Sequence, residues 1–207
     1  LVMRKTLRLY ALFLLFYSGL AVLGVFPMSV ALAMVEVIVM VLPISSFSYD
    51  EAAKWDRYAA VLPVGRTAVV KARYLFLLLV LLAAAAIGLV GSILASLLAR
   101  KDLGELLATL LVSMGLGLMI ADIMLPVVYQ LGPERARPWM YVIIFAPIVV
   151  LLGGTKLGLF DGIDLSWLDQ LPELAVLGVF ALVPLVPLVG MLLSCWISCR
   201  IYARKEF

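Results

Sequence analysis

The sequence of 207 residues contains no histidine, two cysteines and only 14% charged residues. Histidine is the most frequent metal ligand and general base in proteins, so its absence argues against a metal site and against most acid–base catalysis. The sequence also has no GxxxxGK(S/T) loop for nucleotide phosphates, no nucleophile elbow and no pair of catalytic carboxylates. These absences predict a chain that is not an enzyme and that binds no metal or cofactor of its own.

Apolar residues make up 66% of the chain, and its mean hydropathy is +1.19. A helix needs about 20 mostly apolar residues to cross a hydrocarbon layer of about 30 Å. Six stretches meet this requirement, at 8–26, 27–47, 74–99, 104–129, 139–155 and 174–199. The sequence therefore predicts one all-α integral membrane domain over residues 1–207, with six transmembrane helices. Because the chain begins at Leu1, we expect that native N-terminal residues precede it.

The basic residues are distributed unevenly between the segments that these spans connect. Thirteen of the sixteen lie in one set of segments, and the opposite set holds Arg100, Lys101 and Lys156. Arginine and lysine accumulate on the cytoplasmic side of a membrane protein. Both termini and the segment 48–73 are therefore predicted to be cytoplasmic. The net charge of +3 then reflects orientation in the membrane and not nucleic-acid binding.

Residues 48–73 form the one long polar segment, and their pattern predicts an amphipathic helix followed by a turn. Ser48 and Glu51 have the spacing of a capping box, which places the start of the helix at Ser48. A second helix is predicted to start near Arg66 and to continue into the third span. Acidic and basic residues are mixed in this segment, which favours a helix that docks on a soluble partner. A helix that anchors to lipid headgroups stays open as the alternative. The expected apolar face contains Trp55, Tyr58 and Leu62.

Glu36 and Asp122 are acids placed well within apolar spans. Such residues usually face the interior of a helix bundle or a cavity. Two interpretations stay open, because these acids either line or gate a transport pathway or act as polar contacts between helices. The prolines Pro126, Pro184 and Pro187 interrupt backbone hydrogen bonding in the fourth and sixth spans. They act either as hinges or as kinks without function, and Pro126 is expected to break the fourth span near its end.

Cys195 and Cys199 lie on one face of the sixth span. The predicted cytoplasmic location is reducing and disfavours a disulfide, so we expect both to serve in packing.

Two segments of the chain resemble type-2 ABC exporter permeases, and in particular the small six-span branch that includes phenol-soluble modulin exporters of Gram-positive bacteria. The first segment contains YDE at 49–51, KWDRY at 54–58, LPVGR at 62–66 and VKARY at 70–74. The second contains LP at 125–126, Tyr129, LG at 131–132 and ERAR at 134–137.

In that family two permease copies, identical or related, pair with two soluble ATPase subunits, which bind ATP and Mg. The resemblance implies that 50–62 is the main coupling helix and that the turn 131–137 is a second, smaller contact. It also implies an amphipathic or hydrophobic peptide, or a toxic hydrophobic compound, as the exported cargo. The implied contacts with the ATPase are Asp50, Glu51, Trp55, Asp56, Tyr58, Leu62, Arg66, Glu134 and Arg135.

Two other functions fit the residues taken alone. An ion-coupled carrier would use Glu36 and Asp122 and would need no ATPase. A membrane immunity or sensor subunit would use the polar segment to recruit a regulator and would transport nothing.

Overall fold

The computed structural model describes residues 2–23, 45–54, 65–100, 102–158 and 172–204, with the single positions 25, 27, 32, 37, 41 and 42. The regular structure in these ranges is helical, which confirms the predicted all-α class. Residues 45–52 form a short helix that precedes α4 in the chain. The longer helices are α1 (Val2–Val22), α4 (Arg66–Ala99), α5 (Leu103–Leu131), α6 (Pro133–Lys156) and α8 (Glu173–Ala203).

Three of the described helices are long and apolar enough to cross a membrane, within α4, α5 and α8. They contain the predicted third, fourth and sixth spans. The first predicted span overlaps α1, whose apolar part is the shorter run Ala11–Ala21. The fifth lies within α6, which is not among the three, and most of the second lies outside the described residues. The full set of six spans stays a prediction.

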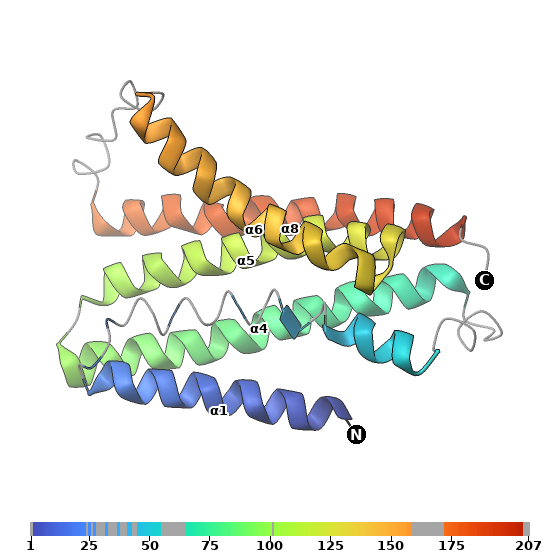
Figure 1. Ribbon diagram of the computed structural model, residues 1–207. Helices are drawn as coiled ribbons and strands as arrows, with labels where there is room; N and C mark the ends of the chain where they lie inside the picture. Colours follow the sequence, from blue (N-terminus) through green and yellow to red (C-terminus); the bar gives the residue numbers. More distant parts are fainter. Residues whose placement is uncertain are drawn as a thin grey trace.

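The long helices form a bundle in which α5 packs against α4, α6 and α8, and α1 lies along α4 (Figure 1). Helix α6 starts beside the end of α5 and then diverges from the bundle (Figure 1). Residues 45–52, the start of α4, the α5–α6 junction and the end of α8 lie at the same end of the bundle (Figure 1). We call this the basic end, because the segments that meet there carry most of the described arginines and lysines.

Helices α5 and α8 approach each other closely at Gly115. A Cβ atom at this position would lie 2.8 Å from the carbonyl oxygen of Val183, so only glycine fits without a shift. Pro187 has no N–H to bond to the carbonyl one turn earlier, which is that of Val183. Small residues are typical where helices approach closely in lipid, because packing rather than hydrophobic burial holds such helices together. The absence of a side chain at Gly115 therefore allows this close approach.

Two predicted boundaries near the basic end are wrong. Ser48 lies inside helical residues 45–52 and so cannot be the N-cap, and Lys54 has a left-handed backbone with φ of 51° just after the helix ends. The predicted turn 131–137 is reduced to Gly132, whose φ is 81°. Pro133 opens α6 directly, because proline suits the first turn of a helix. The predicted start of a helix at Arg66 is confirmed by α4.

Candidate functional site

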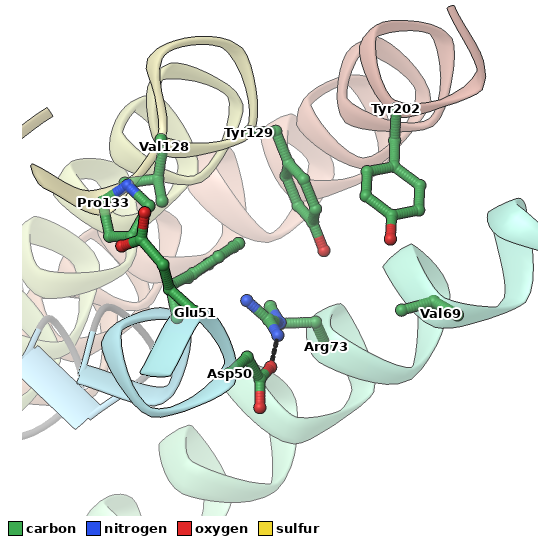
Figure 2. Close-up of a pocket in the computed structure, with 10 residues that line it drawn as sticks. Asp50, Glu51, Val69, Arg73, Val128, Tyr129, Pro133 and Tyr202 are labelled. Carbon is green, nitrogen blue, oxygen red and sulfur yellow. Dashed lines mark hydrogen bonds and ion pairs between the residues drawn. The ribbon is translucent and has the colours of Figure 1, made fainter. Parts of the chain in front are cut away.

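The basic end contains a cavity of about 80 Å³ lined by residues from 45–52, α4, α5, α6 and α8 (Figure 2). Asp50 and Glu51 reach it from the short helix, and Arg73 reaches it from α4. Tyr129 of α5 and Tyr202 of α8 extend toward the side on which Arg73 lies (Figure 2). Segments far apart in the sequence thus place charged and aromatic side chains around one small space.

Arg73 connects the short helix to the bundle. Its guanidinium forms an ion pair with the carboxylate of Asp50, and its Cζ atom lies 3.6 Å from the centre of the Phe47 ring. The Arg73 side chain is 11% exposed and that of Asp50 is 36% exposed, so the pair is only partly open to water. A planar guanidinium can stack on a ring and bond to a carboxylate at the same time, which an ammonium group does less well. Arg73 therefore holds both Phe47 and Asp50 against α4.

Aromatic rings extend this contact to α5 and α8. The rings of Phe47 and Tyr129 meet edge to face with centroids 4.9 Å apart. Tyr129 and Tyr202 are 5.6 Å apart in a similar arrangement. Edge-to-face pairs add attraction beyond the burial of their area. The short helix, α4, α5 and α8 each contribute one side chain to a connected cluster of Phe47, Arg73, Tyr129 and Tyr202, which we call the arginine cluster.

The predicted coupling residues take different positions around this site. Asp50 faces Arg73, and Glu51 lines the cavity while remaining exposed. Glu134 and Arg135 are exposed on the first turn of α6, beside the α5–α6 junction. Arg66 is the first residue of α4. The other predicted contacts lie outside the described residues: Trp55, Asp56, Tyr58 and Leu62.

Asp122 lies in α5, with 9% of its surface exposed. Neither of its carboxylate oxygens has a hydrogen-bond partner among the described residues. Gly190 of α8 lies opposite, where a Cβ atom would be 3.6 Å from one carboxylate oxygen. Asp122 therefore sits at the α5–α8 interface, and its role as a pathway group or a structural contact stays a prediction. Glu36, its predicted companion, lies outside the described residues.

The prolines lie inside helices that continue through them. Helix α5 runs to Leu131 past Pro126, so the predicted break near the end of this span is wrong. Pro126 leaves the Asp122 carbonyl without its usual backbone donor, and the Ser194 hydroxyl donates to that oxygen at 2.6 Å. A neighbouring side chain thus satisfies the freed carbonyl, as helices in membranes require. Pro184 and Pro187 are both buried within α8.

Sequence reasoning missed several residues that the structure brings together. Tyr74 of α4 bonds to Ser194 and Ser198 of α8, and Arg73 makes the contacts described above. One signal was available, because Ser194 and Ser198 are hydroxyl residues one turn apart in an otherwise apolar span. The two cysteines beside them, Cys195 and Cys199, carry free thiols and are partly buried.

Comparison with known protein families shows which family this chain belongs to. Residues 1–203 match the family described as ABC-2 family transporter protein, so the chain belongs to that family. This family forms the membrane component of ABC transporters and not the ATPase, which accounts for the missing phosphate-binding loop and implies a separate ATPase subunit. A search of curated proteins and a search of solved structures each found no significant match.

Proposed function

We propose that this chain is the permease subunit of an ATP-driven exporter and that the segment 45–73 receives its ATPase. The observation that supports the proposal is that residues 45–54 contact the bundle through some side chains and expose others to solvent. Their inner side is fixed to the bundle by Phe47 and Asp50. Several of their other residues are exposed to solvent: Tyr49, Glu51, Ala52, Ala53 and Lys54. A segment anchored on one side and open on the other can pass the movement of a soluble partner into the membrane.

The second contact in this proposal is the start of α6. Glu134, Arg135 and Arg137 are exposed at the same end of the bundle as residues 45–54. An ATPase that covers both places would touch the chain on either side of the arginine cluster. The cluster would then lie under the docked subunit, where a change in its binding between nucleotide states can move helices.

The proposed cargo is an amphipathic or hydrophobic peptide, or a hydrophobic toxic compound, as in the phenol-soluble modulin branch that the sequence resembles. The described spans support this choice because their buried polar groups are few: Ser92, Ser113, Asp122, Ser194 and Ser198. The outer face of α8 exposes apolar side chains such as Leu185, Val189 and Leu193. This face suits contact with lipid or with a second permease copy in a dimer. In this proposal the protein lies in a bacterial plasma membrane with both termini in the cytoplasm.

The test is purification of the tagged permease from its native membrane, with mass spectrometry of the proteins that remain bound. We expect a soluble ATPase with a GxxxxGK(S/T) loop, and we expect Trp55→Ala and Asp56→Ala to release it. Trp196→Ala is the matched control, because Trp196 is an exposed tryptophan of α8, with 52% exposure, and is not among the implied contacts with the ATPase. Full retention of the ATPase by the Trp55 and Asp56 variants would contradict the docking assignment.

Transport in vesicles separates the exporter from the ion-coupled carrier. A fluorescent amphipathic helical peptide should enter inside-out vesicles when ATP and Mg are supplied together with the ATPase. Uptake driven by a proton gradient without ATP, and lost on Asp122→Asn, would contradict the exporter.

A further inference from the structure

Arg73 and Tyr74 are consecutive residues of α4 whose side chains make contacts with different parts of the molecule. Arg73 binds Asp50 and Phe47 of the short helix. The Tyr74 hydroxyl lies 2.6 Å from the Ser194 oxygen and 2.8 Å from the Ser198 oxygen, both on α8. Tyr74 is 3% exposed and Ser198 is fully buried. One turn of α4 therefore touches the short helix and α8 at the same time.

The direction of each hydrogen bond follows from counting protons. The Ser194 hydroxyl donates its one hydrogen to the Asp122 carbonyl, because a carbonyl can only accept. Ser194 must then accept from Tyr74, which uses the single phenolic hydrogen. Ser198 must in turn donate to the Tyr74 oxygen. The result is a chain of three bonds, from Ser198 to Tyr74 to Ser194 to the Asp122 carbonyl, which we call the hydroxyl chain.

The hydroxyl chain ends where α5 has lost a bond of its own. Pro126 has no N–H for the Asp122 carbonyl, so Ser194 supplies the donor that the helix lacks. The four residues beyond Pro126 include Tyr129, which belongs to the arginine cluster. The last turns of α5 thus contact the short helix by an aromatic ring and α4 and α8 through the hydroxyl chain.

We propose that Tyr74 is a positioning residue that transmits displacement of residues 45–54 to the ends of α5 and α8. This inference rests on the proposed function for its purpose, since an ATPase would supply the displacement. A pull on Asp50 moves Arg73, and Tyr74 moves with it because both belong to one rigid helical turn. The hydroxyl chain then carries the movement to α8 and to the Pro126 region of α5. Any coupling of this kind acts equally in both directions.

Hydrogen–deuterium exchange of the purified permease in phospholipid nanodiscs tests the inference without any ATPase. Asp50→Asn should speed exchange in residues 45–54 and also in 194–203 of α8. Tyr74→Phe should speed exchange in 123–131 and 194–203 and, by reciprocity, in 45–54. Loss of one hydrogen bond predicts changes of roughly fivefold. Tyr141→Phe is the matched control, because Tyr141 lies on α6 with 58% exposure, and it should change nothing.

A purely local role for Tyr74 would give a different pattern. If Asp50→Asn changes only 45–54 and the first turns of α4, the transmission is absent and the inference is overturned. If Tyr74→Phe fails to fold, Ser198→Ala removes the donor to Tyr74 and should give the same pattern at reduced size. Failure of the exporter proposal can be told apart from failure of this inference. The exchange pattern is measured on the permease alone, so it stays the same whether or not an ATPase binds the chain.

Discussion

The middle of the α5–α8 interface and the basic end are held together by different kinds of interaction. In the middle, Gly115 meets the backbone of Val183, and a contact between backbone atoms has little freedom to slide. At the basic end an ion pair, edge-to-face rings and hydroxyl groups join helices through side chains. Side-chain contacts of this kind can lengthen, rotate or exchange partners. Helices α5 and α8 therefore form a fixed pair in the middle of their interface, and their ends at the basic end are adjustable.

The largest expected effect comes from filling the fixed contact. Gly115→Val should lower the free energy of unfolding by about 3 kcal/mol, because the new side chain meets backbone atoms that cannot rotate away. Gly178→Val is the matched control on α8, where a Cβ would have no neighbour within 4 Å. Unfolding in a titration with SDS measures both. Equal stability of the two variants would show that the interface is not fixed at Gly115.

The next effect comes from removing the centre of the adjustable end. Arg73→Leu should cost about 2 kcal/mol, because a charge-assisted bond and ring contacts are lost while Asp50 can still reach water. It should also release the short helix, so trypsin should cut after Lys54 faster than in the unchanged protein. Arg73→Lys keeps the charge and should show an intermediate rate. An unchanged cutting rate in Arg73→Leu would mean that other contacts seat the segment.

An effect of similar size tests the bond that replaces the one lost at Pro126. Ser194→Ala should lower the free energy of unfolding by about 2 kcal/mol, since the buried Asp122 carbonyl loses its donor and the Tyr74 hydroxyl loses its acceptor. In a Pro126→Ala background the same change should cost less, because residue 126 then supplies a backbone N–H to that carbonyl. The double-mutant cycle measures this coupling directly. Strict additivity would contradict the link between Pro126 and Ser194.

The smallest effect on stability is expected at the exposed start of α6. Glu134 and Arg137 form a pair at 3.6 Å, with side chains 74% and 65% exposed. Exposed pairs contribute little, so Glu134→Gln should change the free energy of unfolding by less than about 0.5 kcal/mol. The same variant should weaken binding of the ATPase, if this turn is the second contact. A large loss of stability would place Glu134 in the fold and not in docking.

Local signals predicted the all-α class and the three long apolar helices α4, α5 and α8, but not the contacts between helices. The start of α4 followed from Gly65 and the apolar run after Arg66, because helix boundaries depend on neighbouring residues. The N-cap at Ser48 was wrong, because the capping-box spacing also occurs inside a helix that starts earlier. The contacts of Arg73 and Tyr74 were missed, since their partners lie 23 and up to 124 positions away. Such pairings depend on which helices pack side by side, and this cannot be read from a single sequence.

The need for a substitute donor to the Asp122 carbonyl could be predicted from the sequence, but the residue that supplies it could not. The presence of Pro126 predicted that a carbonyl one turn earlier needs a substitute donor. The sequence did not reveal that Ser194 would supply it, because that requires α5 and α8 to be neighbours. The general requirement was predictable and its solution was not.

The most direct test of the account is a distance measurement in the assembled transporter. Spin labels at Leu97 on α4 and Leu193 on α8, both exposed, would report movement of α8 within the bundle by pulsed EPR after Cys195 and Cys199 are replaced by alanine. Binding of ATP to a hydrolysis-deficient ATPase docked on residues 45–54 should shift this distance, and Tyr74→Phe should reduce the shift. An identical distance with and without bound ATP would contradict the claim that residues 45–54 pass movement into the membrane.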